Sequence, residues 1–167
     1  MLHVYDVPQR YAADWNQRPT AAFVDEIAAA RPVLIVPHGG VASIGTSIAL
    51  AWNGRTEASR VIHFALPFLW TAKRVVVLEV EVAGRQRGLS SEAVVRYLAQ
   101  HGVEALSESV ARNGRSIGES LLAAANAMET DLLIMGGNAQ TRLRHLIFGT
   151  VTSDILTGAT FPVLLAH

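Results

Sequence analysis

The sequence contains no cysteine, and this absence excludes disulfide bonds, thiol nucleophiles and thiolate metal sites. It has no apolar run of the roughly 18–20 residues that a membrane-spanning helix requires. Neither sign of charge is in excess, because Lys and Arg together number 14 and Asp and Glu also number 14. A chain without a positive excess is not expected to bind nucleic acid or anionic membranes in general. Residues 1–15 carry Asp6, Arg10 and Asp14 and no apolar stretch, so we expect no secretory signal and a cytoplasmic location.

Length and apolar content suit one folded domain. The chain has 167 residues, of which 50% are hydrophobic, enough for a single core and a short appendage. From residue 47 onward, apolar runs alternate with helical patterns. The expected strands cover residues 47–52, 74–82, 103–110, 131–135 and 162–165, and the expected helices cover residues 56–69, 91–101, 116–129 and 150–156.

This alternation predicts the fold class. Strands separated by helices need crossover connections, which are almost always right-handed and give a mostly parallel sheet. We therefore expect an α/β, three-layer domain with an open, mostly parallel five-stranded sheet and helices on both faces. Two local signals support the helix boundaries. Ser116 stands three residues before Glu119, the spacing of a capping box, and Pro67 should kink or end the first helix.

The N-terminal forty residues fall outside this alternation. Residues 20–30 have a helical pattern and residues 31–37 read as a strand. That strand shares the sequence Pro-Val-Leu with residues 161–166, and each copy follows a helical segment, which indicates a helix–strand unit used twice. Chance similarity between two core strands is the alternative. We divide the chain into an N-terminal extension of residues 1–40, a helix and strand, and a main domain of residues 41–167.

Two connections at one edge of the predicted sheet carry residues that suit an anion. In an open parallel sheet, ligands bind beyond the carboxyl ends of the strands. There Asn53 follows the first strand, Gly136 follows the fourth, and Gly149 and Thr150 open the next helix. Glycine lets the backbone approach a phosphate, a helix N-terminus offers amides, and Arg142 can add a charge-assisted contact. A tight turn and an ordinary helix start explain the same glycines without a ligand, so both interpretations stay open.

Residues 135–156 resemble the signature of the universal stress protein family. In that signature a strand ends in Gly and is followed by two residues, a second Gly, nine residues, and then Gly with a small hydroxyl residue. Gly136, Gly149 and Thr150 match the pattern with its spacing preserved. Ala139 stands where the family has its second glycine, which is a departure from the pattern.

The resemblance extends to residues 49–54 and 65–67, around the first strand and helix, and to residues 161–165 at the end. It covers roughly residues 47–167 and implies the adenine nucleotide alpha hydrolase-like fold. Within the family, the chain looks like the second half of tandem members, which carry two such domains. On that view residues 20–37 are the last helix and strand of a truncated first domain.

The resemblance also has implications for assembly. Members of the family associate through their last strands, which implies a homodimer formed by those strands. The alternative is a monomer in which residues 33–37 pair with residues 163–166. They would then take the place of a partner's strand and cover the sheet edge.

The ligand implied by the resemblance is ATP or a related adenine nucleotide, with Mg²⁺ if it is bound. In binding members the residue after the first strand contacts the adenine–ribose end and is usually Asp; here Asn53 keeps hydrogen bonding and loses the charge. Ala139 keeps its amide, but its methyl group occupies space. The expected nucleotide-binding residues are Asn53, Gly136, Ala139, Arg142, Gly149 and Thr150.

The implied function is that of a stress-response protein that acts by nucleotide-dependent association or signalling. The alternatives are a structural or interaction member that binds no nucleotide and a weak ATP hydrolase. We expect no catalytic residue and no metal site, since the six histidines lack metal-ligand spacing. His145 lies between Gly136 and Thr150, in the loop that carries the glycine pattern, and is interpreted as a solvated side chain. Asp154 and Glu57 are expected on solvated helix faces, and Trp52 is expected in the core.

Overall fold

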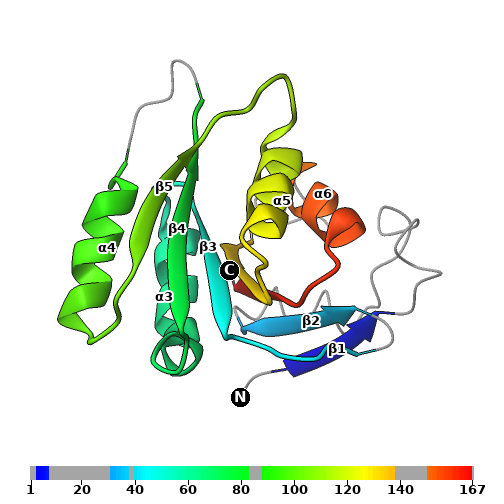
Figure 1. Ribbon diagram of the computed structural model, residues 1–167, viewed down its shortest axis with the longest axis horizontal. Coiled ribbons are helices and arrows are strands. Elements are labelled where there is room, and N and C mark those ends of the chain that lie inside the picture. The colour runs from blue at the N-terminus through cyan, green and yellow to red at the C-terminus, as the bar shows by residue number, and fades with distance from the viewer. Residues whose placement is uncertain (1–2, 8–30, 38–39, 83–87, 138–149, 167) are drawn as a thin grey trace.

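Seven strands form one sheet in the computed structural model of the chain, with the order β1-β2-β7-β6-β3-β4-β5 (Figure 1). The structure describes residues 3–7, 31–37, 40–82, 88–137 and 150–166. The strands are β1 His3–Val7, β2 Val33–Pro37, β3 Ser47–Trp52, β4 Arg74–Val80, β5 Leu106–Val110, β6 Leu132–Gly136 and β7 Val163–Ala166. Every neighbouring pair is parallel except β2 and β7. The expected mostly parallel sheet is therefore confirmed.

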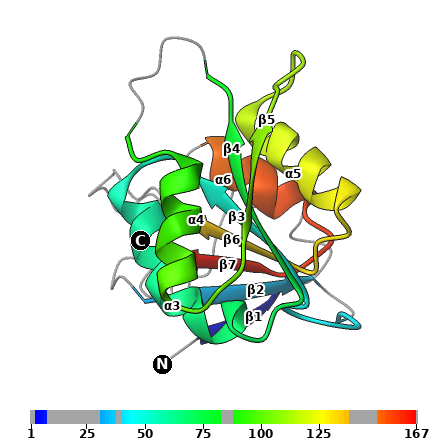
Figure 2. The same ribbon diagram turned by 60° about the vertical axis from the view of Figure 1, so that its left-hand side comes forward.

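Helices cover both faces of this sheet. Those in the described residues are α3 Thr56–Leu69, α4 Ser91–Gln100, α5 Ile117–Ala127 and α6 Thr150–Gly158. α3 and α4 lie on one face, and α5 and α6 lie side by side on the other (Figures 1 and 2). This is the predicted three-layer α/β architecture. All five strands and four helices expected after residue 47 are present, although the strand expected over residues 103–110 begins only at Leu106.

The core is split by the sheet into two apolar clusters. On β6, Leu132 and Ile134 belong to the cluster beneath α3 and α4, whereas Leu133 and Met135 belong to the cluster beneath α5 and α6. All four side chains are buried. Continuous apolar runs of this kind are typical of parallel strands that helices cover on both sides.

The N-terminal strand covers the edge of the last strand. β2 pairs antiparallel with β7, with Val33 opposite Leu165, Leu34 opposite Leu164 and Ile35 opposite Val163. This confirms the pairing hypothesis drawn from the repeated Pro-Val-Leu sequence. The antiparallel register is centred on Leu34 and Leu164, the leucines of the two Pro-Val-Leu copies, so the two similar segments run past each other in opposite directions.

The N-terminal segment also contains one strand that was not predicted. β1 pairs parallel with β2, and the sequence analysis did not predict this strand. The helix expected over residues 20–30 lies outside the described residues, and the domain boundary at residues 40–41 stays a prediction. Among the helices that the structure describes, none combines the length and the apolar character needed to cross a membrane.

Helix boundaries follow the local signals. At α5 the Ser116 hydroxyl accepts a hydrogen bond from the Glu119 amide at 3.1 Å, and the Glu119 carboxylate accepts one from the Ser116 amide at 2.7 Å. The capping box is thus confirmed. Pro67 lies inside the last turn of α3, which ends two residues later at Leu69.

Asp131 fastens the amino-terminal edge of the sheet. Its carboxylate accepts hydrogen bonds from the backbone amides of Gly45, Thr46 and Ser47, at 3.1, 3.1 and 2.8 Å. Burial acts to raise the pKa of this carboxyl group, but hydrogen bonds from the Ser43 side chain and from the Ser47 and Thr46 amides outweigh it. The pKa of Asp131 therefore lies below its ordinary value. The charged carboxylate ties the segment that leads into β3 to the start of β6.

We predict that Asp131→Asn lowers the free energy of unfolding by about 1–2 kcal/mol at neutral pH, because a charged acceptor of three amides is replaced by a neutral one. Since the folded-state pKa is depressed, the wild-type advantage is fully present above the unfolded pKa of about 4 and is lost as the pH falls through the folded value. Urea unfolding between pH 7 and pH 2 measures this. Glu104→Gln, at an exposed position, is the control, and an equal difference between wild type and Asp131→Asn at all pH values would contradict the prediction.

Candidate functional site

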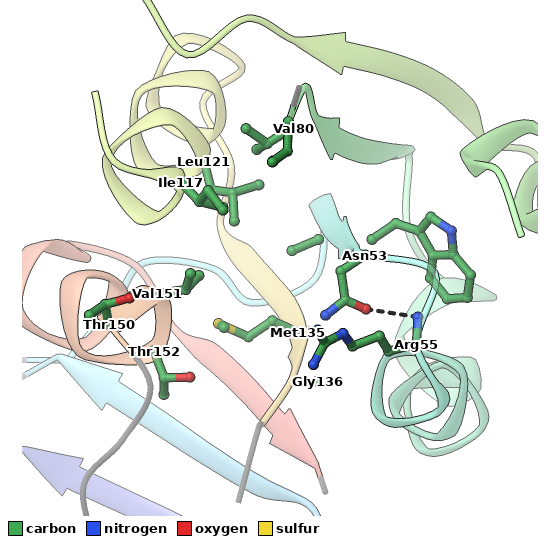
Figure 3. A pocket seen from close by; sticks show the side chains of 13 residues that line it. Asn53, Arg55, Val80, Ile117, Leu121, Met135, Gly136, Thr150, Val151 and Thr152 are labelled. Carbon is green, nitrogen blue, oxygen red and sulfur yellow. Dashed lines mark hydrogen bonds between the residues drawn. The ribbon is translucent and has the colours of Figure 1, made fainter. Parts of the chain in front are cut away.

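A cavity of about 390 Å³ opens at the carboxyl ends of the central strands (Figure 3). β3, β4 and β6 end at it, and the first turns of α5 and α6 close its sides. Its lining residues are Ala51, Trp52, Asn53, Arg55, Val80, Val82, Ile117, Leu121, Met135, Gly136, Thr150, Val151 and Thr152. The volume falls within the range of small-molecule sites, about 300–1,000 Å³. The position is the one where open parallel sheets bind their ligands.

The turn between β3 and α3 forms one wall of the cavity. The Asn53 side-chain oxygen accepts a hydrogen bond from the Arg55 amide at 3.0 Å, an arrangement typical of Asx turns. Gly54 has a φ of +72°, which glycine adopts without strain. The buried Trp52 indole donates a hydrogen bond of 2.7 Å to the Leu89 carbonyl oxygen and joins this turn to the start of α4. Trp52 is thus a core residue, as expected, and also lines the cavity.

Gly136 forms the floor of the cavity, and packing alone requires a glycine there. A Cβ atom at position 136 would lie 2.6 Å from the Ala58 amide nitrogen and 2.7 Å from the Glu57 carbonyl carbon. Only a residue without a side chain therefore lets the first turn of α3 rest on the end of β6. The next glycine is different, since a Cβ atom at Gly137 would meet the Ala166 carbonyl oxygen at an ordinary 3.6 Å.

The opposite wall is the first turn of α6, which is fastened to α5. The Ser116 hydroxyl donates a hydrogen bond of 2.6 Å to the Asp154 carboxylate, in addition to capping α5. Gly118 allows this close approach, because a Cβ atom there would collide with the Asp154 side chain. The expectation of a solvated helix face is wrong for Asp154, which is half-buried and holds two helices together.

The polar side chains of the described lining are one amide, one guanidinium and two hydroxyls. They come from Asn53, Arg55, Thr150 and Thr152, and no carboxylate is among the described lining residues. Thr152 is 4% exposed, and its hydroxyl has no hydrogen-bond partner within the described part of the chain. In Figure 3 this hydroxyl points from α6 toward the side of Gly136. A buried hydroxyl that finds no partner among the described residues is costly unless another group satisfies it, and a bound ligand is one such group.

Three of the six expected site residues meet in this cavity. Asn53 comes from the β3–α3 turn, Gly136 from the end of β6 and Thr150 from the start of α6. The other three, Ala139, Arg142 and Gly149, lie outside the described residues, as does His145. Their expected role stays a prediction.

The sequence analysis missed Arg55 and Thr152. Arg55 had a signal, because it lies two residues after a strand end and directly before a helix, where Ser, Thr, Asp or Asn is preferred. Thr152 had none, since one hydroxyl inside a short helical pattern does not reveal its face. The apolar wall of Val80, Ile117 and Leu121 was likewise hidden, because these side chains converge only in the folded sheet.

Comparisons with known proteins agree on the fold. The family model described as "Universal stress protein family" matches residues 47–167. A search of curated protein sequences finds no match to the chain. A universal stress protein from Archaeoglobus fulgidus DSM 4304 has a similar structure, with a TM-score of 0.66 and 16% identity, covering 82% of this chain and 51% of that one. The present chain therefore spans about half the length of that protein.

Two smaller structures are also similar. A universal stress protein in complex with cAMP gives a TM-score of 0.56 at 16% identity and covers 75% of this chain and 98% of that one. A universal stress protein from Archaeoglobus fulgidus in complex with dAMP gives 0.54 at 20% identity and covers 75% and 100%. At these identities the likeness establishes the fold.

We predict that Gly136→Ala lowers the free energy of unfolding by about 2–3 kcal/mol, because the new methyl group meets backbone atoms of α3 that have no room to move. Gly137→Ala is the matched control on the adjacent residue and should cost less than about 1 kcal/mol. Urea unfolding of the two variants compares them. Equal stability of the two variants would show that α3 does not rest on β6 at Gly136.

Proposed function

The chain belongs to the universal stress protein family, and on that premise we propose that it binds ATP or a related adenine nucleotide in the cavity between β3, β6 and α6. The observation that carries the proposal is the buried Thr152 hydroxyl, which lines the cavity and has no partner in the described part of the chain. Nucleotide binding would then control association or signalling in a stress response.

The two ends of the cavity differ in chemistry, as a nucleotide requires. Val80, Ile117 and Leu121 form an apolar side, suited to the flat face of a base. Thr150 stands at the start of α6, where helix amides favour a phosphate, and Asn53 faces it across the cavity from the β3–α3 turn (Figure 3). Two similar structures, a universal stress protein in complex with cAMP and another in complex with dAMP, support an adenine nucleotide as the ligand class.

A second function is favoured by one observation. Gly136 is explained by its contact with α3 alone, so the glycine would remain even in a protein that binds no nucleotide. A structural or interaction member of the family is therefore the competing proposal. The hydrolase alternative has no comparable support, since the described lining contains no carboxylate or histidine that could act as a base.

For assembly, we propose the monomer capped by its own N-terminal strand. β2 occupies the edge of β7 that a partner's strand would need, and a strand edge forms only one ladder on each side. We predict that sedimentation equilibrium gives the mass of a single chain. Deleting residues 1–37 would expose the β7 edge and should produce dimers or aggregates. A dimer of the full chain that survives this deletion unchanged would argue against the capped monomer.

The nucleotide proposal predicts that ATP binds to the purified protein in calorimetry with Mg²⁺, and that Thr152→Val weakens this binding about tenfold through loss of one hydrogen bond. Valine has nearly the same shape, so the unliganded variant should be as stable as the wild type or up to about 1 kcal/mol more stable. Thr157→Val, at an exposed position on the same helix, should leave both quantities unchanged.

Two results would decide against nucleotide binding. One is the absence of nucleotide from denaturing extracts together with no heat signal at millimolar ATP, which would favour the structural alternative. The other is unchanged ATP affinity in Thr152→Val, which would remove the cavity from the proposal.

A further inference from the structure

Arg55 is a poor choice for the position it occupies in the fold. It is the N-cap residue of α3, and its side chain makes no capping hydrogen bond. Ser, Thr, Asp and Asn are preferred at this position because their side chains accept a hydrogen bond from the first helical amides. An arginine also brings a positive charge to the positive end of the helix dipole. Local stability therefore disfavours Arg55, and such conflicts with local preference are expected at functional sites.

The same side chain faces the cavity. Arg55 lines it beside Asn53, and in Figure 3 the two lie across Gly136 from the first turn of α6. It is the sole charged residue in the described lining, and no ion pair engages it among the residues that the structure describes. A guanidinium with five donors in a planar fork matches phosphate geometry. In its described lining the cavity thus presents a positive charge with no acidic partner.

The described lining residues do not fit a protein-bound Mg²⁺. This cation is usually held by one or two carboxylates together with substrate phosphates, and the described lining offers none. No cluster of three or more His, Cys, Asp or Glu side chains suited to a metal occurs in the described ranges. In the sequence, residues 83–87 and 138–149, which lie outside the described residues, contain four arginines and no acidic residue.

We infer that Arg55 supplies the counter-charge for a phosphate group of the bound nucleotide and that binding does not require a divalent cation. The inference rests on the proposed nucleotide function and adds the residue and the charge state to it. Arg55 therefore contributes to phosphate recognition, while the apolar side of the cavity holds the base. On this inference, an arginine stands at the N-cap position of α3, despite its cost to local stability, because it makes this contact.

Calorimetry with ATP and with adenosine, each in Mg²⁺ and in EDTA, tests this. Wild-type affinity for ATP should change less than about threefold between Mg²⁺ and EDTA. Arg55→Gln should weaken ATP binding about tenfold, the effect of one lost charge-assisted contact, and should leave adenosine binding unchanged. Arg60→Gln removes the same charge from an exposed position on the same helix and should alter neither ligand.

A second variant separates recognition from folding. Arg55→Ser introduces a preferred N-cap residue, so its melting temperature should rise by about 2–4 °C, while its ATP affinity falls as in Arg55→Gln. A contact that matters only to the fold cannot give these opposite signs. A lower melting temperature in Arg55→Ser would overturn the inference that the residue is retained against local stability.

The outcomes also distinguish this inference from the proposed function. If wild type binds neither ATP nor adenosine in either buffer, the nucleotide function fails and the Arg55 inference fails with it. If wild type binds ATP only with Mg²⁺, or if Arg55→Gln retains full ATP affinity, nucleotide binding stands and the Arg55 inference alone is refuted. Equal losses for ATP and adenosine in Arg55→Gln would also refute it, since adenosine has no phosphate.

Discussion

The contact between the end of β6 and the first turn of α3 is the constraint on which the cavity depends. β6 lies between β3 and β7 in the sheet, and Gly136 at its end lets the α3 backbone approach within the space that a methyl group would need. At the other end of the same strand, Asp131 accepts three amides from the segment that leads into β3. The two neighbouring strands are thus aligned at their starts by charge and hydrogen bonds, and at their ends by the absence of a side chain. The shape of the cavity floor depends on the Asp131 hydrogen bonds and on the contact between Gly136 and α3.

The two helices α5 and α3 begin at this edge of the sheet, and they differ in whether their N-cap residue makes a capping hydrogen bond. α5 starts at Ser116 with a complete capping box, and the same hydroxyl reaches Asp154 on α6. α3 starts at Arg55, which caps nothing. Both helices are amphipathic and both are held by packing, so the difference does not follow from a need for stability. It matches the position of each residue relative to the cavity. Ser116 is not a lining residue and connects α5 to α6, whereas Arg55 lines the cavity. The residue that departs from helix preference is the one that faces open space.

Much of this architecture could be predicted from the sequence, because its main elements have strong local signals. Apolar strands rich in β-branched residues and the spacing of Ser116 and Glu119 depend on neighbours in sequence, and the corresponding elements are confirmed. β1 was missed: His3–Val7 contains two valines and a tyrosine, but the run is only five residues long and its place in the sheet depends on pairing with β2. Gly136 was singled out because it matches the first glycine of the family signature. Its contact with α3 could not be predicted, because that contact depends on tertiary packing. Thr152 was missed for the same reason: its burial is decided by what packs against α6.

The pairing of β2 with β7 has a symmetry that random matching of two core strands would not require. The repeat places Val33, Leu34 and Ile35 in the same order as Val163, Leu164 and Leu165, and the antiparallel register is centred on Leu34 and Leu164. Each residue therefore faces the counterpart of its mirror position, as in the contact between two identical strands related by a two-fold axis. A chain that carries its own copy of this strand offers β7 the contacts that a second molecule would offer. It does so without the entropy cost of bringing two molecules together, so the internal strand has the advantage in any competition for that edge.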